Sequence, residues 1–139
     1  MSMPFHGGCH CGAVTVSFTS TLDPAATSPR ACDCSFCRRH GAAWVSDPAG
    51  ELAIAARDGR LVRYRQGSNA ADFLLCARCG VLVAVVLEDG GVRFGAVNAG
   101  CLDSQFAVAR CASPQQLARD EKVERWRRLW APRVVVSER

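Results

Sequence analysis

Residues 31–41 read ACDCSFCRRHG and place three cysteines within six positions. Cys32, Cys34 and Cys37 form a C-x-C-x2-C pattern, close enough along the chain to bind one ion from a single turn or loop. Three protein ligands with an open fourth position are typical of a catalytic zinc site, whereas four are typical of a structural one. An empty thiol cluster is a further alternative. Three side chains could supply a fourth protein ligand: His40, Cys101 and Cys111.

Two further cysteine pairs lie far apart in the chain, and each is followed by glycine. The first reads CHCG at residues 9–12, and the second reads CARCG at residues 76–80. Glycine lets the backbone turn so that N–H groups point at a metal-bound sulfur. Together the pairs predict a closed, structural four-thiolate zinc site; the alternative is a set of buried or redox-active thiols. Its ligands would be Cys9, Cys11, Cys76 and Cys79.

Composition favours metal ligands over disulfides. The chain has 139 residues, which fits a single domain over 1–139, and its nine cysteines are an odd number. Residues 1–20 lack the pattern of a signal peptide, so we expect a cytoplasmic protein with reduced thiols. No apolar run is long enough for a membrane span. Seven thiolates on two Zn²⁺ ions would lower the formal charge of +4 by three, to about +1, so we expect no nucleic-acid partner.

The pattern of apolar residues and turns predicts a mainly β fold with curled, antiparallel sheets and one C-terminal helix. The run VLVAVVL at 81–87 is typical of a buried strand. The helix is expected at about 114–130, with Ser113 as its cap and Pro132 after its end. Its apolar face would hold Leu117, Val123, Trp126, Leu129 and Trp130. The other expected strands are 13–18, 42–46, 51–56, 61–65 and 92–98.

Four motifs in order give the chain a resemblance to a known family over about residues 5–105. They read GGCHCGAV (7–14), CDCSFCRRHGA (32–42), CARCG (76–80) and AVNAGCLD (96–103). The set resembles the glutathione-dependent formaldehyde-activating family, which includes centromere protein V. The resemblance implies a mainly β fold shared with a small zinc-bearing chaperone of Rab GTPases.

The resemblance also implies ligands and chemistry. It implies a structural zinc on the four paired cysteines and a catalytic zinc on Cys32, Cys34 and Cys37. The implied activity is that of a carbon–sulfur lyase, in which glutathione and formaldehyde condense to S-hydroxymethylglutathione or the adduct splits. The partners would then be a small thiol such as glutathione and an aldehyde. The runner-up hypothesis is a zinc-stabilised binding module or thiol carrier with no turnover.

The chain departs from the family pattern in three places. Asp33 stands where the middle motif more often has histidine, and we expect it to face away from the metal. Cys101 stands where a threonine or serine is usual, so it could complete or poison the open site. The tail lacks the stretch with histidine and tryptophan that many members carry. We also consider Arg38 and Arg39 as partners for the carboxylates of glutathione.

Overall fold

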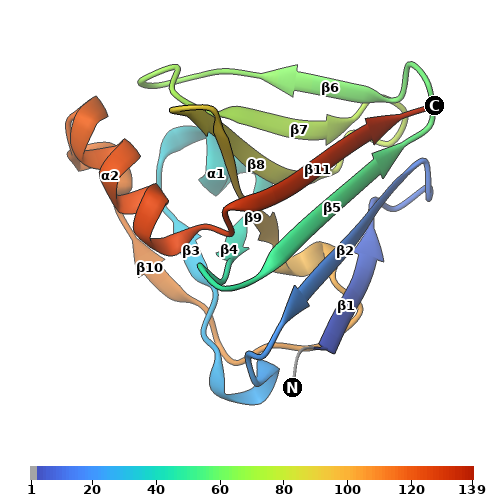
Figure 1. The fold of residues 1–139 in the computed structure, drawn as a ribbon, viewed down its shortest axis with the longest axis horizontal. Helices are drawn as coiled ribbons and strands as arrows, with labels where there is room; N and C mark the ends of the chain where they lie inside the picture. Colours follow the sequence, from blue (N-terminus) through green and yellow to red (C-terminus); the bar gives the residue numbers. More distant parts are fainter. Residues whose placement is uncertain (1–2) are drawn as a thin grey trace.

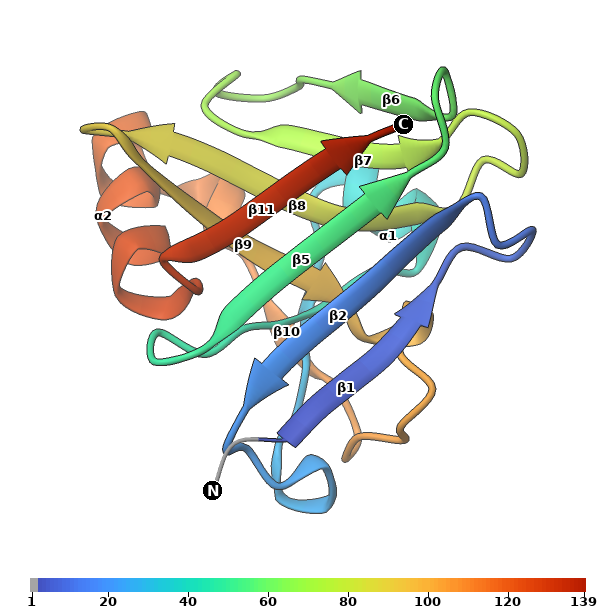
Figure 2. The same cartoon turned by 45° about the vertical axis from the view of Figure 1, so that its right-hand side comes forward.

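Two β-sheets packed face to face make up most of the computed structural model, which describes residues 3–139 (Figures 1 and 2). The four-stranded sheet has the order β1 (Met3–Gly8), β2 (Val14–Ser20), β5 (Glu51–Ala56), β11 (Arg133–Glu138). The seven-stranded sheet has the order β10 (Arg110–Ala112), β3 (Arg30–Cys32), β4 (Ala43–Val45), β9 (Val92–Asn98), β8 (Leu82–Asp89), β7 (Asp72–Cys76), β6 (Leu61–Tyr64). The helices are α1 (Ser35–His40) and α2 (Arg119–Leu129). Short 3-10 turns cover Pro24–Ala26, Ala99–Cys101 and Pro114–Gln116.

The main core lies between the two sheets. In β2 and β5 every second side chain is buried, as expected for strands with one face on a core. Phe18 and Ile54 of the four-stranded sheet belong to one apolar cluster with Val83 and Val97 of the seven-stranded sheet. Figure 2 shows the four-stranded sheet in front of β8 and β9.

The seven-stranded sheet is covered on both faces. Every residue of 82–87 in β8 is buried, which confirms the prediction made from the apolar run. One face of this strand meets the main core, and the other meets a second apolar cluster that includes Phe73 and Trp130. This second cluster also contains Cys32 and Cys37, so the three-cysteine motif lies on the outer face of the larger sheet.

The mainly β class is confirmed, with two differences in topology. Most strand pairs are antiparallel, but β10 pairs with β3, and β11 with β5, in parallel. Sequence patterns did not indicate the strands β1, β3, β7, β10 and β11. β10 has only three residues, and β11 is half-exposed along much of its length, so neither carries a clear apolar alternation.

The C-terminal helix begins later than the capping pattern predicts. Ser113 does not cap a helix; its hydroxyl donates instead to the carboxylate of Asp33 at 2.8 Å. The chain makes a short 3-10 turn, and α2 follows after Ala118, whose N–H donates to Glu121 Oε1 at 2.9 Å. The predicted apolar face is otherwise in place, except that Leu117 precedes the helix and Trp130 directly follows it. Within residues 3–139, no helix is long and apolar enough to cross a membrane.

Candidate functional site

The structure brings together the four paired cysteines. Cys9 and Cys11 lie in the turn between β1 and β2, while Cys76 ends β7 and Cys79 lies in the turn before β8. All four Sγ atoms lie within 4.8 Å of one another; Cys11 Sγ is 3.7 Å from Cys9 Sγ and 3.6 Å from Cys76 Sγ. A tetrahedron of thiolates around zinc has edges of about 3.8 Å, since Zn–S bonds are about 2.3 Å long. This cluster therefore fits a zinc ion.

Backbone N–H groups point at these sulfurs, as the trailing glycines indicate. The N–H of Val14 donates to Cys9 Sγ at 3.2 Å, and that of Cys79 donates to Cys76 Sγ at 3.4 Å. Gly12 and Gly80 have backbone φ angles of 84° and 78°, which residues with a Cβ rarely adopt. Backbone donors, the Val81 N–H first, lower the pKa of Cys79 to about 6. The backbone of these turns thus favours the thiolate of Cys79, the form that binds metal.

The second cluster is local to β3 and α1. Cys32 ends β3, Cys34 precedes α1 and accepts the N–H of Cys37 at 3.3 Å, and Cys37 lies within α1. The three Sγ atoms lie within 4.8 Å of one another. A hydrogen bond from Cys37 lowers the pKa of Cys32 to about 6, whereas this bond and burial raise the pKa of Cys37. The end of a strand and the start of a short helix, rather than a single turn or loop, present these thiols.

None of the three candidates for a fourth ligand joins this cluster. Within residues 3–139, no further histidine, cysteine or carboxylate places a ligand atom within 4.8 Å of all three sulfurs. His40 is exposed, and its ring lies 4.7 Å from the ring of Phe36. Cys111 is exposed on the edge strand β10.

Cys101 lies beside the four-cysteine cluster instead of the three-cysteine cluster. Its buried thiol donates to the carbonyl of Leu82 at 3.4 Å. Burial and the nearby Cys9 and Cys79 raise the pKa of Cys101 to about 11, which keeps this thiol protonated. The prediction that Cys101 could complete or poison the three-cysteine site is wrong, because the loop carrying it packs on the other face of the larger sheet.

A pocket of about 90 Å³ opens over the three-cysteine cluster. The three cysteines form part of its wall, with Trp44 and Phe73 from the sheet and Gln66 from the loop after β6. Helix α2 and the residue after it supply Trp126 and Trp130. The three tryptophans of the chain therefore all line this pocket.

The pocket gathers cations beside its thiols. Arg30, Lys122 and Arg125 line it together with the three cysteines, and among residues 3–139 no aspartate or glutamate does. Burial, together with the neighbouring Arg125, lowers the pKa of Arg30 to about 10. Sequence reasoning missed this arginine, although a strand places residues i and i+2 on one face, so Arg30 had to share a face with Cys32. The predicted carboxylate partners, Arg38 and Arg39, are exposed and do not line the pocket.

Asp33 faces away from the sulfurs, as expected. Its carboxylate accepts Ser113 Oγ at 2.8 Å and Gln115 Nε2 at 2.5 Å. These bonds lower the pKa of Asp33 and connect the three-cysteine motif to the segment that leads into α2. Asn98 has a structural role, with Nδ2 donating to the carbonyl of Leu82 at 2.9 Å.

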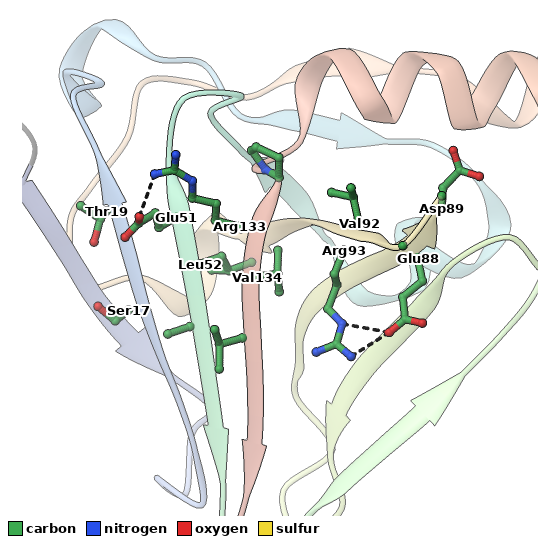
Figure 3. A pocket seen from close by; sticks show the side chains of 15 residues that line it. Ser17, Thr19, Glu51, Leu52, Glu88, Asp89, Val92, Arg93, Arg133 and Val134 are labelled. Carbon is green, nitrogen blue, oxygen red and sulfur yellow. Dashed lines mark hydrogen bonds and ion pairs between the residues drawn. The ribbon is translucent and has the colours of Figure 1, made fainter.

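A larger depression, of about 830 Å³, lies elsewhere, between β5–β11 and the β8–β9 hairpin (Figure 3). Its charged side chains are all in ion pairs: Arg133 with Glu51 at 3.2 Å, Arg93 with Glu88 at 2.7 Å, and Asp89 with Arg127 of α2 at 2.7 Å. Among residues 3–139, no cysteine or histidine lines it. We therefore place the candidate functional site at the smaller pocket, where thiols meet cations that form no ion pair within the described part of the chain.

Comparisons with known proteins agree with the motifs. A family model described as "Glutathione-dependent formaldehyde-activating enzyme" matches residues 4–119. A crystal structure of a Rhodobacter sphaeroides protein, a structural genomics target, is 31% identical to this chain and superposes with a TM-score of 0.57. The match covers 71% of this chain and 88% of the other.

Proposed function

Because the chain belongs to the family of glutathione-dependent formaldehyde-activating enzymes, we propose that it joins a thiol to an aldehyde or splits their adduct. The thiol would be glutathione or a similar molecule, and the aldehyde would be formaldehyde or another small aldehyde. In the forward direction a sulfur–carbon bond forms, the carbonyl electrons move to oxygen, and the thiol proton ends on that oxygen. The enzyme would thus be a carbon–sulfur lyase.

The two cysteine clusters would each hold one zinc ion, in different roles. The four-cysteine cluster has a complete ligand set and would be structural. Zinc on Cys32, Cys34 and Cys37 would supply a fourth position for a substrate thiolate and would lower the pKa of that thiol. Because Cys32, Cys34 and Cys37 lie close together in the sequence, they could bind this zinc ion without a ligand from a distant segment of the chain.

The observation that carries the proposal is the contrast between the clusters. Three sulfurs lie at a pocket that aromatic side chains and cations line, and within residues 3–139 no fourth protein ligand approaches them. A site that only stabilised the fold would have no need of an open position or an adjoining pocket. His40 does not line the pocket, so water would carry the proton to the new alkoxide.

The side chains around the sulfurs have separate tasks in this proposal. Trp44, Phe73 and Trp126 exclude water from the reacting sulfur and hold the apolar part of a substrate. Gln66 Nε2 lies 4.0 Å from Cys34 Sγ and can donate to sulfur or to a bound thiol. The cations favour anionic forms of the substrate.

The first test is a zinc count by native mass spectrometry, combined with NMR exchange rates for glutathione, formaldehyde and their adduct. We expect two zinc ions per chain and faster exchange than in buffer. The variant Cys34→Ser should retain its fold, keep one zinc ion and lose the acceleration. Cys111→Ser is the matched control, since its exposed thiol lies outside both clusters.

Exchange by Cys34→Ser at the parent rate would refute the mechanism. Two zinc ions without any acceleration in the parent protein would instead favour the non-catalytic binding module. One tightly held zinc ion, with Cys32, Cys34 and Cys37 open to alkylation, would favour that alternative as well.

A further inference from the structure

Helix α2 forms one wall of the three-cysteine pocket, and it lies beyond the part of the chain that the family model matches. The match ends at residue 119, whereas α2 covers Arg119–Leu129. Lys122, Arg125 and Trp126 of α2 line the pocket. Figure 1 shows the helix packed beside the β8–β9 hairpin. This wall is therefore a contribution of this chain rather than of the matched family region.

Several contacts hold α2 against the pocket. Trp130, directly after the helix, is 4% exposed, and its ring stacks on Trp126 at 4.7 Å between centroids. The carbonyl of Leu129 accepts Ser46 Oγ at 2.7 Å. Arg127 pairs with Asp89 at 2.7 Å. The position of the wall is thus fixed by packing, a hydrogen bond and an ion pair.

A further cation, Arg30, lines the same pocket as the cations of this wall. Arg30 of β3 donates to Ser46 Oγ at 2.7 Å and is close enough to Arg125 for the two charges to repel. Lys122 Nζ reaches over the loop after β6, 3.9 Å from the position that a Cβ on Gly67 would occupy. Within residues 3–139, none of these three cations forms an ion pair with a carboxylate.

Like charges gathered in a partly buried pocket are costly unless an anion neutralises them. Arginine and lysine around an apolar cleft favour a carboxylate, with guanidinium groups able to bind both of its oxygens. A zinc ion on the nearby Cys32, Cys34 and Cys37 would bind the thiol at the other end of the same molecule.

We propose that Lys122 and Arg125 of α2, together with Arg30, determine the substrate class by binding a carboxylate of the thiol. The enzyme then prefers a thiol with a negative charge near its sulfur over a neutral thiol of the same size. The inference rests on the proposed function for the thiol, but charge preference in binding can be measured without any turnover.

The test compares 3-mercaptopropionate with its methyl ester, which has the same thiol and skeleton but no charge. Because all three tryptophans line the pocket, tryptophan fluorescence of the zinc-loaded protein gives the binding constants. We expect the acid to bind about tenfold more tightly than the ester, the effect of one charge-assisted contact. This preference should weaken as salt is added.

The double variant Lys122→Gln, Arg125→Gln should lose most of this preference while the ester binds as before. Arg128→Gln is the matched control, because Arg128 is an exposed cation of the same helix that does not line the pocket. It should keep the full preference. Circular dichroism would verify that α2 remains helical in each variant.

Equal binding of acid and ester by the parent protein, binding of neither, or a preference that survives in the double variant would overturn the inference. The proposed function fails separately. Charge preference without acceleration of adduct exchange would refute only the enzyme, whereas acceleration without charge preference would refute only the role of α2.

Discussion

At the residue scale, Gly7, the first of two glycines before Cys9, allows the backbone of β1 to come unusually close to the backbone of Cys101 and Leu102. A Cβ on Gly7 would lie 1.8 Å from the carbonyl oxygen of Cys101 and 2.8 Å from Cα of Leu102. Gly7 forms a β-bridge with Leu102, which brings the 99–103 loop against β1. This contact holds the loop of Cys101 next to the four-cysteine cluster.

Gly7→Ala should destabilise the fold by about 3 kcal/mol, because the methyl group would meet backbone that cannot move without breaking this bridge. Urea denaturation followed by circular dichroism measures the change. Gly100→Ala is the control, since its Cβ would have only an ordinary contact with Asn98 Oδ1 at 3.8 Å. A Gly7→Ala variant as stable as the control would contradict this close approach.

Both cysteine clusters could be predicted from the sequence, whereas the pocket around one of them could not. Short spacing and trailing glycines identify the cysteine motifs, and both are local signals in the sequence. The pocket combines Arg30, Gln66 and Arg125 from three distant segments, and only tertiary packing places them together. Arg38 and Arg39, which lie next to the motif in sequence, point elsewhere because α1 turns them to solvent.

At the element scale, the C-terminal helix shows where local signals and tertiary contacts compete. Its existence, apolar face and end before Pro132 follow from the sequence. The start of the helix could not be predicted, because the hydroxyl of Ser113 donates a hydrogen bond to the carboxylate of Asp33 instead of capping the helix. A capping pattern cannot reveal that an acceptor 80 residues away is within reach.

Trp130→Ala should show how strongly this element depends on its last contact. Removing a side chain that is 4% exposed and stacked on Trp126 should lower the free energy of unfolding by about 3–5 kcal/mol. Urea denaturation followed by circular dichroism gives the value. Val108→Ala, at a position 87% exposed, should change it by less than about 0.5 kcal/mol. Similar stabilities for both variants would mean that α2 is not anchored through Trp130.

At the scale of the whole molecule, the two clusters differ in what they connect. The four-cysteine cluster joins the β1–β2 turn of the smaller sheet to the β7–β8 turn of the larger sheet. The three-cysteine cluster connects only β3 and α1, which are neighbours in sequence. Loss of metal from the first should therefore free the sheets from each other, while loss from the second should act locally.

Cys76→Ser should lower the melting temperature far more than Cys34→Ser. Cys76 is buried and contributes one sulfur to a cluster that connects both sheets. A serine there would remove the contribution of metal binding to the folding free energy of the entire chain. Thermal denaturation of both variants, with and without a chelator, checks the order. If Cys34→Ser melted at the lower temperature, the assignment of the structural cluster would be reversed.

The parallel pairing of β11 with β5 has a consequence for the speed of folding. Arg133 is paired with Glu51, so the whole segment 57–132 must be enclosed before this ladder can form. Closing so large a loop costs chain entropy before any contact offsets it, and chains with many such distant pairings fold slowly. Until β11 arrives, β5 is the edge of its sheet, with unpaired N–H and C=O groups that can pair with another chain. The arrival of β11 thus determines how long a refolding chain stays prone to aggregation.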